Sequence, residues 1–228
     1  MPGSRTIAES ERLRWKVEFA LPALRTAAHR LAAHPRIAEL YPEYLIQSHW
    51  VVRASVPLME AARARAVELG AADSEADGLV AYLTEHISEE LHHDDWLLED
   101  LEVIGFERRA VLARPPAAAA AALVGAQYYW IHHSHPVALM GYMSVLEGQA
   151  SSQAQIEQLV DRTGYDRRAF RTLFEHADLD HHHADELHRT LDRLSLAPAN
   201  STLVGMSAMH TVTTLAHIFD EIVDSARP

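Results

Sequence analysis

Hydrophobic residues recur every three or four positions along most of this chain, which is the period of a helix with one buried side. The sequence shows no sustained alternation of polar and β-branched apolar residues, the pattern that is typical of strands. We expect helices over residues 8–33, 44–69, 79–104, 117–133, 136–147, 153–163, 166–196 and 201–225. The pattern therefore predicts an all-α protein, with residues 1–228 forming a single domain of about seven or eight helices.

Prolines and glycines set the expected ends of these helices. Pro35 closes the first helix, because the residue before a proline avoids helical backbone angles. Pro57 is expected to bend the helix over 44–69, since proline removes a backbone hydrogen bond. Gly105 ends the third helix, and the charged segment 107–116 is expected to be a loop.

Composition excludes several classes of protein and of site. The chain has 228 residues, a formal net charge of −12, sixteen histidines and no cysteine. Without cysteine there are no disulfides, thiolate zinc sites or cysteine-ligated iron–sulfur clusters, so nitrogen and oxygen atoms must hold any metal. The negative charge and the lack of a basic stripe argue against a nucleic-acid partner.

Hydropathy indicates where the protein works. The sequence has no uninterrupted apolar run long enough to cross a membrane. Residues 1–16 mix charged and polar residues and lack the apolar stretch of a secretory signal. We therefore expect a cytoplasmic protein with no membrane span.

Two helical segments carry a carboxylate followed three residues later by histidine. They are Glu90-x-x-His93 and Asp180-x-x-His183, and each has a further histidine four residues before its carboxylate, His86 and His176. Positions i, i+4 and i+7 lie along one face of a helix, so each cluster can converge on one point. Bundle proteins use such clusters from two helices, with single glutamates from two more, to hold a pair of iron or manganese ions.

Helical phase selects among the acidic residues of the third expected helix. If residues 79–104 form one continuous helix, Glu90 lies near the middle of the buried side, with His86 and His93 at its border. Glu89 and His92 then fall on flanking or opposite surfaces, as does Glu85. The apolar residues that define this side are Val80, Leu83, Ile87, Leu91, Leu98 and Leu101.

The long helix over 166–196 offers two triplets of equal spacing. One is His176, Asp180 and His183, and the other is His181, Asp185 and His188. Asp180 is in line with the apolar positions of this helix, whereas Asp185 lies well off them. We favour the first triplet, and the second stays open as an alternative.

Two further acids interrupt apolar runs. Glu147 ends the nearly uncharged segment 137–147, and Glu60 follows the segment 54–59 near the side marked by Val52, Val56 and Met59. Because a buried carboxylate needs a partner, both acids are candidate ligands from other helices.

These residues together resemble a known family, the haem-oxygenase-like diiron oxidases and oxygenases, also described as iron-containing redox enzymes. The likeness lies in Glu90-x-x-His93, in the later Glu147, and in the triplet His176, Asp180 and His183. The separations between these motifs are similar to those of the family, and Glu60 matches by position its earlier carboxylate.

The resemblance implies a haem-oxygenase-like bundle of seven helices and two irons that activate O2. The implied metal ligands are Glu60, Glu90, His93, Glu147, His176, Asp180 and His183, with His86 as a partner of the ligands. The implied reactions are oxidations of a small organic molecule such as an amine, an amino acid or a fatty acid. Manganese in one of the two sites stays open, because oxygen and imidazole donors suit both metals.

Alternatives to this reading come from other classes of protein. A non-oxygenating iron-binding protein or ferroxidase would use the same donors without an organic substrate. A metal-free or haem-binding member of the same fold would need only one of the histidines. The expected partners are O2 and an unidentified small molecule, and the oligomeric state, including a homodimer, stays open.

Overall fold

The computed structural model describes residues 7–149 and 151–226, and it describes only the backbone of Asp180 and His181. Over these residues the chain forms eleven α-helices and three short 3-10 helices, and no strand. In order they are α1 (Glu9–Ala32), α2 (Ile37–Val52), α3 (Ser55–Leu69), η1 (Gly70–Ala72), α4 (Ala76–Glu90), α5 (His93–Val103), α6 (Arg108–Leu112), α7 (Ala118–His133), η2 (Pro136–Ala138), α8 (Leu139–Glu147), α9 (Gln153–Thr163), η3 (Arg167–Phe170), α10 (Arg171–Leu194) and α11 (Pro198–Asp224). The all-α prediction is confirmed, but the expected number of helices is too low.

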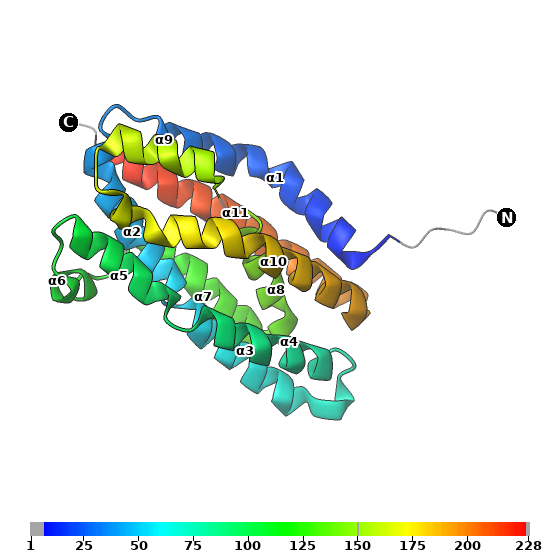
Figure 1. Ribbon diagram of the computed structural model, residues 1–228. Coiled ribbons are helices and arrows are strands. Elements are labelled where there is room, and N and C mark those ends of the chain that lie inside the picture. The colour runs from blue at the N-terminus through cyan, green and yellow to red at the C-terminus, as the bar shows by residue number, and fades with distance from the viewer. Residues whose placement is uncertain (1–6, 150, 227–228) are drawn as a thin grey trace.

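The long helices lie side by side in a bundle (Figure 1). Helix α1 packs along α11, and α11 packs in turn against α7 and α8. Helix α10 runs through the middle of the view and contacts α4, α5 and α8. None of the helices in the described part of the chain is long and apolar enough to cross a membrane.

The extra helices come from breaks that periodicity did not reveal. The segment 44–69 was expected to bend at Pro57, but the break lies at Arg53–Ala54, between α2 and α3. Pro57 then sits in the first turn of α3, where a missing N–H breaks no helical hydrogen bond. The charged segment expected to be a loop contains the one-turn helix α6.

The segment 79–104 also divides into two helices, α4 and α5. Leu91 leaves the helix with a ψ of 127°, and His92 adopts a left-handed conformation with a φ of 71°. Leu91 was expected on the buried side, but 48% of its surface is exposed. The prediction that Leu91 is buried was wrong because residues 79–104 do not form one continuous helix.

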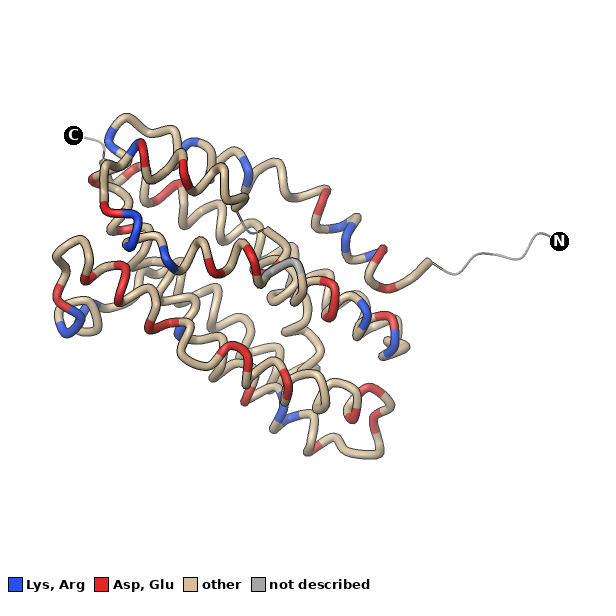
Figure 2. The backbone as a smooth tube through the Cα atoms, in the orientation of Figure 1, with Lys and Arg blue, Asp and Glu red and all other residues tan. Residues whose placement is uncertain are grey.

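Two helices carry almost no charged side chains. Helix α7 has no Lys, Arg, Asp or Glu, and α8 has only Glu147, so both are drawn almost entirely in tan (Figure 2). Helix α8 also approaches α11 very closely, because a Cβ at Gly141 would lie 2.1 Å from the carbonyl oxygen of Val204. Glycine at this position allows the contact that fixes α8, and thereby Glu147, in the bundle.

Candidate metal centre

Four helices bring nitrogen and oxygen donors to one place in the interior. Two groups of three side chains have ligand atoms that all lie within 4.8 Å of one another. The first group is His86, Glu90 and His183, and the second is Glu90, His93 and His176. Glu90 belongs to both groups, so its two carboxylate oxygens can serve two neighbouring ions, as in dinuclear carboxylate bundles.

The break between α4 and α5 places Glu90 and His93 together. Glu90 is the last residue of α4, and His93 is the first of α5. Across the break, Nδ1 of His93 lies 3.1 Å from Oε2 of Glu90. A left-handed conformation is uncommon for a residue other than glycine, so His92 carries a backbone cost at the position that directs His93 inward.

Glu147 reaches the same place from the end of α8. Its Oε1 lies 3.0 Å from Nε2 of His86 in a hydrogen bond. Burial raises the pKa of Glu147, and the His86 imidazole opposes that rise. Burial lowers the pKa of His86, but Glu147 and the other nearby carboxylates outweigh burial and raise this pKa above its usual value.

Several buried ligand atoms in this cluster make no well-aligned hydrogen bond, although most of them lie within 3.6 Å of an oppositely polar atom. They are Nδ1 of His86, Oε2 of Glu89, Nδ1 of His93, Oε2 of Glu147 and Nδ1 of His183. A buried polar atom that stays unsatisfied costs about 1–3 kcal/mol, and a bound cation would satisfy the atoms gathered here. A set of imidazoles and carboxylates fits iron or manganese, whose sites combine nitrogen and oxygen donors.

His176 and His183 of α10 favour the neutral form that can bind a metal. Burial lowers the pKa of both His176 and His183, which favours the uncharged imidazole that binds metals. Nδ1 of His176 lies 2.9 Å from the carbonyl oxygen of Thr172. As the donor in that contact, Nδ1 carries the proton, and Nε2 is left free to coordinate.

Glu90 is ionised under the same conditions. Burial raises the pKa of Glu90, but His93, His86 and His176 together outweigh burial and hold this pKa below its usual value. A carboxylate that stays charged in the interior is suited to a bound cation.

The structure brings together five of the seven predicted ligands. They are Glu90, His93, Glu147, His176 and His183, joined by His86, which was expected only as a partner of the ligands. The side chain of Asp180 lies outside the described residues, and so does that of His181. In the alternative triplet, Asp185 is exposed and His188 belongs to neither donor group, so the described members favour the first triplet.

The prediction that Glu60 lies on the buried side of its helix is wrong. Leu58 and Met59 occupy the buried positions of α3, and Glu60 is exposed. Each residue turns the helix by about 100°, which carries the side chain after Met59 out towards solvent.

Glu89 is a neighbour of the cluster that sequence reasoning rejected. Its Oε2 lies 3.4 Å from Nδ1 of His86 and 3.6 Å from Nε2 of His183. Helical phase placed Glu89 on a flanking or opposite surface of its helix, and its side chain is 33% exposed. The spacing of three residues from His86 is the signal that could have found it.

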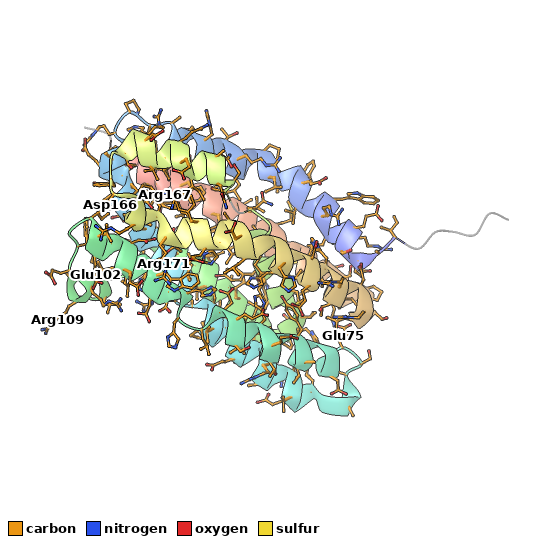
Figure 3. The ribbon with its side chains drawn as sticks, in the orientation of Figure 1. Glu75, Glu102, Arg109, Asp166, Arg167 and Arg171 are labelled. Atoms are coloured by element: carbon orange, nitrogen blue, oxygen red, sulfur yellow. The ribbon has the colours of Figure 1, made fainter. Side chains whose placement is uncertain are left out.

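A third group of possible ligands lies outside this cluster and is structural in character. Nε2 of His135 lies 3.1 Å from Asp73, and Nδ1 of the same ring accepts from the backbone of Val137. Glu75 accepts hydrogen bonds from the backbone of Ala197 and from Asn200. Figure 3 shows Glu75 at the opposite end of the bundle from Asp166. The donors here satisfy one another, so this group fastens α4 and η2 to the start of α11.

A cavity of about 210 Å³ adjoins the donors. His86, Glu90, Glu147 and His176 form part of its wall. The rest of the wall consists mainly of apolar and hydroxyl side chains from α2, α3, α8 and α10, including Val52, Met59, Leu139, Tyr142, Met143 and Thr172. Space for a small molecule therefore lies directly beside the candidate metal centre.

Solved structures with the same fold are similar over almost the whole chain. A domain of unknown function with a haem-oxygenase-like fold from Shewanella denitrificans OS217 shares 18% identity at a TM-score of 0.79, covering 94% of this chain and 91% of that one. A TenA homologue from Pseudomonas syringae pv. tomato DC3000 shares 14% identity at a TM-score of 0.65, covering 91% and 92%. A CADD-like protein of unknown function from Nostoc punctiforme PCC 73102 shares 15% identity at 0.66, covering 94% and 98%. The haem-oxygenase-like fold expected from the motifs is thereby confirmed.

Sequence comparison identifies the family. No curated protein matches the chain. Residues 42–213 match the family described as iron-containing redox enzymes, and this range includes every donor of the cluster. The chain therefore belongs to the iron-containing redox enzyme family.

Proposed function

We propose that this protein is a non-haem diiron enzyme that uses O2 to oxidise a small organic substrate. The observation that carries the proposal is the pair of three-donor groups that share Glu90. One shared carboxylate with separate histidines on each side is the arrangement expected for two metal ions, not for one. Two ferrous ions bound here would supply the electrons that reduce O2.

Different side chains are assigned to each of the two ions. Glu90 would hold both ions, His86 and His183 would hold one of them, and His93 and His176 would hold the other. Glu147 is within reach of the first position through its contact with His86. The side chains of His86, Glu90 and His93 are largely buried, which strengthens the electrostatic interactions inside the site.

The cavity beside the donors favours an organic oxidation over the iron-storing alternative. A ferroxidase needs a path for iron, whereas this cavity has largely apolar walls that suit a carbon skeleton. The convergence of buried acids and imidazoles argues against the metal-free and haem-binding alternatives, since such proteins gain nothing from gathering these groups at one point.

Anaerobic titration of the metal-free protein with Fe(II) tests the proposal. We expect binding to saturate near two ions per chain, and admission of O2 should then consume the bound Fe(II). Glu90→Gln should reduce the stoichiometry below two, because the amide lacks the charge that both ions share. Glu85→Gln is the matched control, since Glu85 is an exposed acid on the same helix.

Saturation at one ion or none in the wild-type protein would refute a dinuclear centre. Equal stoichiometry in Glu90→Gln and the wild type would refute the bridging role of Glu90. If two ions bind but O2 is consumed only in the amount that oxidises the iron, whichever organic compound is added, the result would favour a ferroxidase.

A further inference from the structure

Two aromatic side chains lie against imidazoles of the donor cluster. Tyr82 of α4 comes four residues before His86, and Trp96 of α5 comes three residues after His93. Residues at these spacings lie on the same face of a helix, so each aromatic ring meets the imidazole of its own helix. The two rings therefore contact different donor groups, because His86 belongs to the first group and His93 to the second.

Trp96 contacts both histidines of the second donor group. Its ring stacks on that of His93, with centroids 3.9 Å apart and planes inclined by 26°. It meets the ring of His176 on α10 at 74°, with centroids 5.9 Å apart. The guanidinium of Arg171 lies 5.0 Å from the centroid of the Trp96 ring, and Arg171 also forms an ion pair with Glu99. Contacts from α5 and α10 thus hold the indole in one orientation.

Tyr82 has the corresponding place in the first donor group. Its ring stacks on that of His86, with centroids 5.4 Å apart and planes inclined by 18°. The ring of His183 meets His86 at 75°, with centroids 4.8 Å apart. Tyr82 is buried, and its hydroxyl makes no hydrogen bond, so the ring and not the hydroxyl makes the contact with His86.

Stacking restricts how an imidazole can turn. A histidine ring rotates about the bond to its Cβ, but a metal ion needs a ring nitrogen that points towards it. A ring packed against the imidazole limits this rotation before the ion arrives, which lowers the entropic cost of binding. Nδ1 of His93 makes no well-aligned hydrogen bond, so the orientation of that imidazole depends strongly on packing.

We propose that Trp96 and Tyr82 are positioning residues, each for one of the two metal ions. Trp96 orients His93 and His176 for one ion, and Tyr82 orients His86 for the other. The inference rests on the proposed function, since it assigns one ring to each of two ions.

Anaerobic Fe(II) titration of ring-deleted variants tests the assignment. In the otherwise wild-type protein, Trp96→Leu and Tyr82→Leu should each weaken one of the two ions about tenfold and leave the other unchanged. Two single-site backgrounds then identify the ion. We expect Trp96→Leu to weaken Fe(II) binding about tenfold in His183→Ala, which keeps the second group, and to have no effect in His176→Ala. Tyr82→Leu should show the opposite pattern.

Conservative variants and a distant ring are the controls. Tyr82→Phe should bind Fe(II) like the wild type, because it keeps the ring, and Trp96→Phe should recover part of the affinity lost in Trp96→Leu. Trp130→Leu is the matched control, because Trp130 contacts His210, which belongs to neither donor group. Denaturant midpoints of the metal-free variants detect a general loss of stability. Trp96 is only half-buried, so Trp96→Leu decides the assignment even if Tyr82→Leu is too unstable to titrate.

The selectivity of the effect determines the outcome. If Trp96→Leu weakens both ions equally or neither ion, the inference is overturned. The stoichiometry of the wild type is measured in the same titrations. Two bound ions without a selective effect of Trp96→Leu refute this inference alone. One bound ion refutes the proposed function, and the inference then stands only if that ion depends on one of the two rings and not on the other.

Discussion

At the scale of single residues, Glu90 shows how an acid is kept charged in an apolar bundle. Burial alone would neutralise it, but three imidazoles from α4, α5 and α10 lower its pKa. Two of these imidazoles, those of His86 and His93, also have a buried Nδ1 that makes no well-aligned hydrogen bond, so an electrostatic cost remains in the cluster. Bound cations would satisfy the carboxylate and the imidazoles together, which makes the metal-free state the strained one.

His92 allows a test of the backbone at this site. Its side chain is 80% exposed, so the residue acts mainly through its left-handed backbone conformation. We expect His92→Val to lower the free energy of unfolding by about 1–2 kcal/mol, because a β-branched residue is strongly disfavoured there, and to weaken Fe(II) binding. His92→Gly should retain both stability and binding, since glycine adopts this conformation readily.

Urea denaturation and Fe(II) titration of both variants provide the measurements. Equal loss of Fe(II) affinity in His92→Gly and His92→Val would show that the imidazole, not the backbone, matters at this position.

The sequence predicted which side chains lie together better than it predicted where the helices break. Glu90, His93, Glu147, His176 and His183 could be found because carboxylate–histidine spacing and isolated acids are local patterns. Glu60 was expected near the buried side but is exposed, because burial depends on where a helix breaks and on what packs against it. The break at Leu91–His92 has no proline or glycine to mark it, so tertiary contacts must impose it.

At the scale of elements, the start of α10 is fixed from another helix. Asp100 of α5 is fully buried, and its carboxylate accepts hydrogen bonds from the backbone N–H groups of Arg171 and Thr172. Burial raises the pKa of Asp100, and the Thr172 side chain together with these backbone bonds opposes the rise. The contact joins two helices that carry metal donors, so it sets the position of His176 relative to His93.

Asp100→Ala tests this connection. Removing the carboxylate leaves two backbone donors of α10 unpaired, and we expect the free energy of unfolding to fall by about 1–3 kcal/mol. Asp100→Asn should lose less, because its amide oxygen can still accept one bond. Asp185→Ala on α10 is the control, since Asp185 is exposed. Chemical denaturation of the metal-free proteins measures the difference, and equal midpoints for Asp100→Ala and Asp185→Ala would contradict the connection.

Element boundaries followed local signals where such signals exist. The first helix was expected over 8–33 and forms over Glu9–Ala32, and the helix expected over 153–163 has those same ends. Helix α9 has a capping box at Ser152 and a left-handed glycine at Gly164, and both signals can be read from the neighbouring sequence. The breaks inside 44–69 and 79–104 were missed because both sides of each break have helical periodicity.

At the scale of the whole molecule, burial favours the neutral form of four histidines in the folded state. Burial lowers the pKa of His49, His176, His183 and His188. For each of them the unfolded chain binds a proton more readily than the folded one below pH about 6.5, the ordinary pKa of histidine. The metal-free protein should therefore lose stability as the pH falls through this range.

His49 isolates this effect away from the donor cluster. It lies on α2, is only 1% exposed, and its Nδ1 has no hydrogen-bond partner. Its contribution to stability is complete above pH about 6.5, where folded and unfolded forms are both neutral, and declines as the pH falls towards the lowered pKa of the folded state.

In His49→Phe that site no longer titrates. We expect the unfolding free energy of the wild type to fall faster below pH about 6.5 than that of His49→Phe, by at most about 1.4 kcal/mol per pH unit. Denaturant titrations of both metal-free proteins between pH 5 and 8 measure the two slopes, and parallel curves would mean that His49 binds its proton equally well in the folded and unfolded states.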